Sequence, residues 1–321
     1  MSSTPIAVAC QGGGSHTAFT AGVLQRVLQE RPPEYEIVAL SGTSGGAVCA
    51  AIAWDGLRRG GAGRAVDRLD AFWDDIAARS PWDRFLNAAV QWGSRVTSEF
   101  GSFGVSPYYH VGSVMTRRRL RRTIERYVDF DDPVPRHPPN LYVGAVGVQS
   151  GSFETFVDGE GGVEALLASA AVPNVFRAAP VTREGKTEYY WDGLFSQNPP
   201  IRQFVSEVPV EGKPAEIWIV RINPRTRPDT PRSLEDIADR RNELSGNLSL
   251  RQEKHTIQTV NELIDETVIT DDRYKQIGFR EVELGMDLDV HSKLDRSRSF
   301  IRRLKRRGRA RADRLWNTEG G

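Results

Sequence analysis

The chain has 321 residues, with 43 Lys and Arg against 42 Asp and Glu, and therefore a net charge of +1. A balance this even gives no overall field for a polyanion, so no nucleic-acid partner is expected. The two cysteines, Cys10 and Cys49, lie in apolar segments without C-x-x-C spacing, which argues against a disulfide framework and against a metal site.

Neither a signal peptide nor a membrane span is visible in the sequence. The N-terminus enters a strand pattern by Ile6 without a basic region, and no apolar run reaches the roughly eighteen residues that a span needs. We therefore expect a cytoplasmic location. Repeats and linkers are not apparent, so we expect a single domain over residues 1–321, with a motif-bearing core at 5–205 and C-terminal strands and helices at 206–321.

The first predicted unit is a strand at residues 6–10, a glycine-rich loop and a helix at 17–29. The loop contains Gly12, Gly13 and Gly14, which allow backbone N–H groups to point toward one place and so to hold an anion or an oxyanion. A dinucleotide site is the alternative. Its G-x-G-x-x-G pattern would need a glycine where Thr17 stands, and an acidic residue at the end of the next strand, where none occurs. No cofactor is expected.

The second unit repeats this arrangement with a serine at the turn. Residues 37–40 are an apolar run of strand length, residues 42–46 read G-T-S-G-G, and residues 47–53 form a small-residue run that suits a tightly packed helix. A sharp strand-to-helix turn needs small residues around its apex, and Gly42 and Gly46 supply them. Ser44 is then exposed at a helix N-terminus, which stabilises developing negative charge. The pattern predicts a serine nucleophile.

Large aromatic residues are concentrated between Trp54 and Tyr109. They could be ordinary helix anchors that bury apolar area, or they could line a cap that receives an acyl chain. The sequence leaves both interpretations open.

Two segments are strongly basic. A helix is predicted from Arg117 to Tyr127, and a solvated helix face is the default interpretation of its arginines. In residues 297–316, Phe300 and Leu304 share one helical face with Ala312 and Leu315, so we expect this helix to pack on the body with its arginines outward. Peripheral contact with anionic lipid is the alternative for both segments.

The remaining pattern alternates strands with helices. Strands are predicted at residues 141–149, 151–157, 187–191, 217–222 and 277–288, and helices at 159–171 and 234–264. This succession predicts an α/β fold with a parallel-type sheet and helices on both faces.

The residue that would accept the proton of Ser44 is not obvious from spacing alone. The five histidines are His16, His110, His137, His255 and His291. None lies in a convincing strand-end loop after an acid, as the order serine, acid, histidine requires, although His291 is the best placed. Asp192-Gly193 follows a strand, and its glycine lets the chain turn away from the carboxylate. Asp158-Gly159 lies in the polar turn V-D-G-E-G-G, which is the ordinary use of this dipeptide.

Four stretches occur in a recognisable order. They are the Gly12–Gly14 loop, residues 42–46, residues 168–176 (ASAAVPNVF) and residues 191–200 (WDGLFSQNPP). Together they resemble the patatin-like phospholipases and acyl hydrolases, with residues 294–312 also similar to bacterial members. His16 and Thr17 depart from the family pattern, which usually has Arg or Lys and then Gly there. The resemblance implies a three-layer α/β/α fold with a mainly parallel central sheet, and a dyad of Ser44 and Asp192 in place of a triad.

The predicted function is therefore a metal-independent carboxylic-ester hydrolase that acts on acyl lipids. In the mechanism that the resemblance implies, Ser44 forms an acyl-enzyme, Asp192 accepts and returns the proton, and the loop glycines hold the oxyanion. Two alternatives remain open: an intracellular depolymerase of hydroxyalkanoate polyester, and a non-catalytic lipid- or nucleotide-binding module that keeps the fold.

Overall fold

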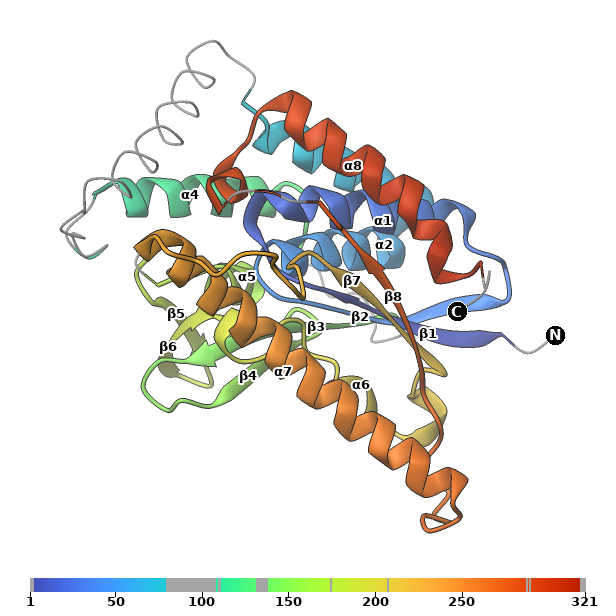
Figure 1. Cartoon of the computed structure of the whole chain (residues 1–321). Coiled ribbons are helices and arrows are strands. Elements are labelled where there is room, and N and C mark those ends of the chain that lie inside the picture. Colours follow the sequence, from blue (N-terminus) through green and yellow to red (C-terminus); the bar gives the residue numbers. More distant parts are fainter. Residues whose placement is uncertain are drawn as a thin grey trace.

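In the computed structural model, one mixed sheet runs through the molecule and helices cover both of its faces (Figure 1). The structure describes residues 3–78, 108, 111–130, 138–173, 175–206, 208–286, 288 and 290–317. The strands are β1 (Thr4–Cys10), β2 (Tyr35–Gly42), β3 (Asn140–Gly147), β4 (Phe153–Val157), β5 (Ala179–Arg183), β6 (Lys186–Asp192), β7 (Glu216–Arg221) and β8 (Gly278–Glu283). The helices are α1 (Ala18–Glu30), α2 (Gly45–Ile76), α4 (Val111–Glu125), α5 (Gly162–Ser169), α6 (Gln203–Ser206), α7 (Leu234–Asp265) and α8 (Arg298–Ala312). Short 3-10 segments are η1 (Gly14–Thr17), η3 (Gly193–Phe195), η4 (Val210–Gly212), η5 (Val290–Leu294) and η6 (Asp313–Leu315).

The centre of the sheet is parallel and one end is antiparallel. The strand order is β5-β6-β3-β2-β1-β7-β8, and β4 pairs with β3 outside this path. Strands β3, β2, β1, β7 and β8 pair in parallel, whereas β4, β5 and β6 join by antiparallel pairing. The predicted α/β class with a mainly parallel central sheet is therefore confirmed, with an antiparallel extension at the β3 side.

Side chains of β1 alternate between two cores, which makes the fold three-layered. Ile6 and Val8 belong to the core under α1, α2 and α8, whereas Ala7 and Ala9 belong to the core on the other face, with residues of α6 and α7. Such alternation is the period of two that a strand imposes. Figure 1 shows α1, α2 and α8 on one side of the sheet and α7 on the other.

The C-terminal helix packs on the body of the protein, as the apolar face of residues 297–316 predicted, and the helix that it contacts is α1. Phe300 and Leu304 are buried, as are Ala312 and Leu315. The backbones of α8 and α1 touch at Gly308, where a β-carbon would collide with the carbonyl oxygen of Phe19. The helix therefore forms part of the core.

Some element bounds, and one strand, differ from the sequence prediction. The helix expected at 159–171 begins only at Gly162, because Gly159, Gly161 and Gly162 all have positive φ. The strand expected at 277–288 ends at Glu283, before Gly285 with φ 51°. Strand β5 was not predicted, since its second residue is Pro180; a proline is tolerated there because β5 lies at the edge of the sheet.

Residues on both sides of position 205 share this one sheet, because β7 and β8 extend it from β1. The single-domain assignment over 1–321 stays a prediction, and the continuous sheet supports it. Among the described helices, none has the length and apolar character to cross a membrane. Within the same residues, no three His, Cys, Asp or Glu side chains gather in a way that could hold a metal ion.

Candidate active site

Ser44 lies at the turn between β2 and α2. Its backbone has φ 55° and ψ −130°, a conformation that costs free energy for any residue with a β-carbon. The turn is held by its neighbour, because Thr43 Oγ1 donates to the carbonyl oxygen of Gln197 at 2.6 Å and the amide of Gly46 donates to the carbonyl oxygen of Thr43 at 2.9 Å. A strained serine fixed at the start of a helix is the geometry expected of a nucleophile.

A second serine supports the first. The amide of Ser44 donates to Ser169 Oγ at 2.9 Å, and Ser169 Oγ in turn donates to the carbonyl oxygen of Gly144 at 2.7 Å. Ser169 is fully buried at the end of α5. Ser169 lies within residues 168–176, one of the four stretches that carry the family resemblance, but its sequence context assigned it no role. The structure shows that it ties the turn to β3.

Strand β3 explains how distant segments reach the turn. Strand β4 pairs with residues 142–146 of β3 and so occupies one of its edges. Strand β2 pairs with residues 140–143 and β6 with residues 145–147, so these two strands share the other edge, one after the other. Only Gly144 separates them.

The two predicted catalytic residues meet at this junction. The chain leaves β2 at Gly42 just before Ser44, while β6 arrives from the opposite direction and ends at Asp192, which is opposite Ala145. Asp192 is completely buried, whereas Ser44 is partly exposed. The sheet therefore brings a buried carboxylate beside a serine hydroxyl that solvent can reach.

Burial controls the chemistry of Asp192. Desolvation raises the pKa of this carboxyl from 3.8 to about 7, and hydrogen bonds from the Leu194 amide and the Ser44 hydroxyl offset part of that rise. Oδ1 accepts the Leu194 N–H at 2.9 Å. The other oxygen, Oδ2, is buried without a partner of normal hydrogen-bond geometry among the described residues. The contact with Ser44 is therefore loose, as is common before substrate binds.

The glycine-rich loop lies against Ser44. A β-carbon at Gly12 would be 2.9 Å from Ser44 Cβ and 2.6 Å from the carbonyl oxygen of Thr43. The Gly12 amide is already used, because it donates to Asn198 Oδ1 at 2.7 Å. The amides of Gly13 and Gly14 have no acceptor among the described residues, and these two glycines are progressively more exposed. They are the free donors of the loop.

Besides Asn198, two polar side chains hold the loop, and no role was assigned to either of them from the sequence. Gln11 Oε1 accepts the amides of Ile222 and Asn223 at 2.9 and 2.8 Å, and Gln11 Nε2 donates to the carbonyl oxygen of Asn198 at 3.3 Å. Asn223 Nδ2 donates to the carbonyl oxygen of Gly12 at 3.3 Å. The only feature of the sequence that could have indicated a role is their position directly after a strand, since Gln11 follows β1 and Asn223 follows β7.

The described histidines do not reach Ser44 or Asp192. His16 is buried with its Nε2 2.7 Å from Ser292 Oγ, and burial lowers the pKa of this imidazole to about 3, so it is neutral. His255 is exposed on α7. Neither forms a hydrogen bond with Ser44 or Asp192. His110, His137 and the side chain of His291 lie outside the described residues.

Two further predictions can be located. Asp158 Oδ1 accepts the Leu141 amide at 2.7 Å, so this carboxylate serves the turn after β4, as predicted. Within the aromatic interval, Trp54, Phe72 and Trp73 are core residues. Residues 79–107, which include the tryptophans proposed for a cap, lie outside the described residues.

A family model for patatin-like phospholipase matches residues 8–205. The chain belongs to the patatin-like phospholipase family. The match spans the glycine-rich loop, the Ser44 turn and the Asp192 segment, and it supports a lipid hydrolase. No curated protein matches the chain.

The solved structures that are similar to this patatin-like protein include VipD and ExoU. VipD from Legionella pneumophila has a TM-score of 0.43 and 13% identity, over 98% of this chain and 67% of VipD. The type III effector protein ExoU has a TM-score of 0.37 and 15% identity, over 98% of this chain and 54% of ExoU. Full-length ExoU of Pseudomonas aeruginosa in complex with SpcU has a TM-score of 0.31 and 14% identity, over 78% and 51%. This chain thus spans about half the length of ExoU.

Proposed function

We propose that this patatin-like protein hydrolyses carboxylic esters of acyl lipids through Ser44 and Asp192, without a metal ion. The observation that carries the proposal is the junction on β3, which brings the strained Ser44 beside a fully buried carboxylate with a pKa of about 7. An ordinary aspartate is a weak base at neutral pH. Burial makes this one basic enough to take a proton from the serine hydroxyl as the hydroxyl attacks.

The first half of the reaction forms an acyl-enzyme. Ser44 Oγ attacks the ester carbonyl carbon while its proton passes to Asp192. The carbonyl oxygen becomes an oxyanion, which the amides of Gly13 and Gly14 stabilise, since Gly12 donates to Asn198 instead. The intermediate collapses, the ester C–O bond breaks, and the leaving alcohol receives the proton from Asp192.

The second half releases the fatty acid. A water molecule gives a proton to Asp192 and attacks the acyl carbon, and a second oxyanion forms at the same donors. When the bond to Ser44 Oγ breaks, Asp192 returns the proton to the serine, and the carboxylic acid leaves. Because one group accepts and donates in turn, no histidine is required.

Labelling with a fluorophosphonate probe, together with a panel of phospholipid and simple ester substrates, tests this function. We expect Ser44→Ala to remain folded, to lose labelling, and to lose ester turnover by a factor on the order of a millionfold, as nucleophile loss does in serine hydrolases. A folded Ser44→Ala variant with turnover within about tenfold of wild type would contradict the assignment. Turnover of a hydroxyalkanoate polyester in preference to lipids would favour the depolymerase, and absence of labelling in the wild type would favour a binding module.

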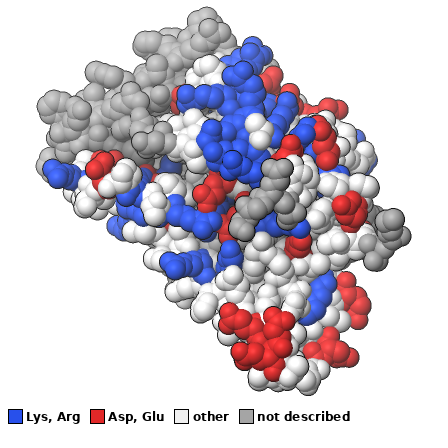
Figure 2. All heavy atoms as spheres, turned by 45° about the vertical axis from the view of Figure 1, so that its right-hand side comes forward, with Lys and Arg blue, Asp and Glu red and all other residues white. Residues whose placement is uncertain are grey.

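Peripheral contact with anionic lipid forms part of the proposal, and α8 is the better of the two basic segments for it. On α4, Arg117 and Arg121 are paired with Glu164 at 2.7 and 2.5 Å. On α8, Arg302 and Arg306 are exposed and have no ion pair or hydrogen bond within the described part of the chain. Figure 2 shows Lys and Arg gathered over the surface that α8 forms.

Co-sedimentation with phosphatidylcholine vesicles, with and without phosphatidylserine, tests the contact. Each basic residue near an anionic surface contributes about 1 kcal/mol, so Arg302→Gln and Arg306→Gln should each weaken binding about fivefold. Arg117→Gln, which removes a paired arginine of α4, is the control. Equal binding to both kinds of vesicle would refute the contact. The cytoplasmic location stays a prediction.

A further inference from the structure

We propose that Gly246 and Asn247 of α7 are positioning residues, which hold the amides of Gly13 and Gly14 where they can bind an oxyanion. Both residues lie outside the segment that the family model matches. The inference rests on the proposed function, because it concerns the glycine-rich loop of that same site. The Gly12 peptide is held by two side chains, which form the clamp: its amide donates a hydrogen bond to Asn198, and its carbonyl oxygen accepts one from Asn223. Gly13 and Gly14, the free donors, follow directly.

Helix α7 contacts the clamp at two consecutive residues. Gly246 packs against Asn198 so closely that a β-carbon there would be 2.7 Å from Asn198 Nδ2. Asn247 Oδ1 accepts a hydrogen bond from Gln11 Nε2 at 3.0 Å, and Asn247 Nδ2 donates to the carbonyl oxygen of Pro224 at 3.0 Å. The helix thus touches the side chain that binds Gly12 and the side chain immediately before Gly12 in sequence.

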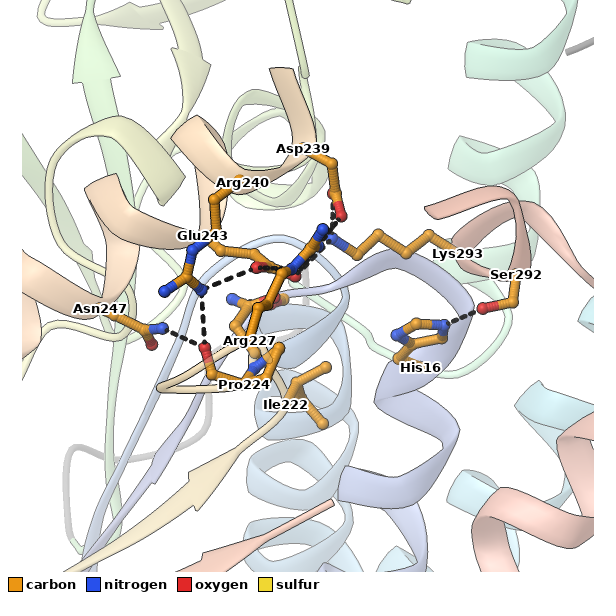
Figure 3. A network of polar contacts seen from close by, with 12 residues as sticks. His16, Ile222, Pro224, Arg227, Asp239, Arg240, Glu243, Asn247, Ser292 and Lys293 are labelled. Atoms are coloured by element: carbon orange, nitrogen blue, oxygen red, sulfur yellow. Dashed lines mark hydrogen bonds and ion pairs between the residues drawn. The ribbon is translucent and has the colours of Figure 1, made fainter. Parts of the chain in front are cut away.

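An ion cluster fixes α7 in this position (Figure 3). Asp239 and Glu243 are almost completely buried on the helix. Arg227, from the loop after β7, binds both carboxylates, at 2.5 Å to Asp239 and 2.7 Å to Glu243. Lys293 of η5 binds Asp239 at 2.5 Å. Because buried carboxylates without partners are costly, the cluster holds three segments in one arrangement.

The same cluster supports the last glycine of the loop. The carbonyl oxygen of Lys293 lies where a β-carbon of Gly14 would approach it to 2.6 Å. Gly14 has φ 56°, a value that favours glycine. The loop is therefore enclosed by Asn198 and Gln11 on one side and by η5 on the other, and α7 contacts all of these supports.

The positioning contacts come from beyond residue 205, where the family match ends. A loop displaced by about 1 Å can cost about a hundredfold in rate, and an absent oxyanion donor costs about a hundred- to a thousandfold. Disturbing α7 at Gly246 or Asn247 should therefore reduce the rate of the chemical step, although neither residue touches substrate.

The first variant pair compares two glycines on helices. Gly246→Ala pushes Asn198 away without removing a polar group, and alanine is the better helix former, so the protein should fold. We expect kcat to fall between about tenfold and a hundredfold, with KM within about twofold of wild type. Gly63→Ala is the control, because a β-carbon there meets no atom within 4 Å on α2. Its kcat should equal that of the wild type.

The second pair compares two asparagines on α7. Asn247→Ala removes the bonds to Gln11 and Pro224. Asn261→Ala removes a matching pair of bonds to the backbone of Ile277, at 2.9 and 3.0 Å, at the far end of the same helix. Both should destabilise the protein to a similar extent, but only Asn247→Ala should lower kcat. It should also weaken binding of a trifluoromethyl ketone, whose adduct with Ser44 carries an oxyanion, by the same factor as kcat/KM.

The outcomes separate this inference from the function on which it rests. If Gly246→Ala and Asn247→Ala keep wild-type kcat while Ser44→Ala is inactive, the function stands and the positioning role is wrong. If Asn261→Ala loses as much kcat as Asn247→Ala, the effect is one of stability alone and the positioning role is again wrong. Full activity of Ser44→Ala would overturn the proposed function itself.

Discussion

Replacing Asp192 with Asn should abolish activity and at the same time stabilise the protein, increasingly so as the pH rises. The carboxyl is fully buried with a pKa of about 7, against 3.8 when exposed. Because the folded state holds this proton more tightly than the unfolded state, rising pH favours unfolding until both states have ionised. The contribution of the protonated Asp192 carboxyl to the free energy of unfolding is therefore complete below about pH 4. It is lost progressively as the pH rises toward 7.

The magnitude follows from these two pKa values. At about 1.4 kcal/mol per pH unit, the earlier ionisation of the unfolded state lowers the free energy of unfolding by about 2 kcal/mol at pH 5 and by about 4 kcal/mol at pH 8. The amide in the Asp192→Asn variant does not ionise, so the stability of the variant relative to the wild type should increase by about 2 to 3 kcal/mol between pH 5 and pH 8. Activity should move the other way, falling by at least about a hundredfold as the base is lost.

Urea denaturation at pH 5 and pH 8, followed by circular dichroism, measures the first effect, and a pH–rate profile of ester hydrolysis measures the second. The wild-type rate should rise about tenfold per pH unit up to a midpoint near 7 and then level off. Asp158→Asn is the control, because an amide oxygen can still accept the Leu141 amide, and its rate should match the wild type. A wild-type profile that is flat from pH 5 to pH 8, or an Asp192→Asn advantage that does not grow with pH, would refute the assignment of Asp192 as the base.

Three further substitutions follow from contacts in the fold. Ser169→Ala leaves the Ser44 amide without its acceptor, which should cost about 1–3 kcal/mol in urea denaturation and lower kcat; unchanged kcat would mean that the turn holds without it. Gly308→Ala should lower the melting temperature markedly, because its β-carbon meets the α1 backbone, and a melting temperature equal to the wild type would show that α1 and α8 can move apart freely. His255→Ala, on an exposed part of α7, should keep the wild-type rate, whereas a dead but folded variant would argue for a histidine base.

The parts of the site that a sequence can predict are those with a local signature. The Ser44 turn and the glycine-rich loop each depend on backbone geometry within a few residues, and small residues in order reveal such geometry. Asp192 was found through a resemblance, because nothing near it in sequence shows that it is buried. Its raised pKa depends on the sheet around it, which no local pattern encodes.

The residues that contact the site from other segments have no local signature of that kind in the sequence. Ser169 and Asn247 are ordinary polar residues on helices, and each reaches the site only because a segment distant in sequence lies beside it: the Ser44 turn beside Ser169, and Gln11 beside Asn247. Strand β5 of the antiparallel end was missed for a related reason, since it is short and contains Pro180. Ser169, Asn247 and β5 all depend on contacts between segments that are distant in sequence. The spacing of hydrophobic residues describes only the segment in which it occurs, so it does not reveal such contacts.

The meeting of β2 and β6 along one edge of β3 also determines when the site comes into existence during synthesis. A growing chain emerges from the ribosome with Gly12 and Ser44 long before Asp192, and the Gly12 peptide must wait for hydrogen-bond partners that lie 186 and 211 residues further along the chain. Contacts of such sequence separation form slowly, because long loops must close before they are made. Partly made or partly folded chains therefore carry Ser44 without Asp192 beside it and without the two asparagines that hold the Gly12 peptide.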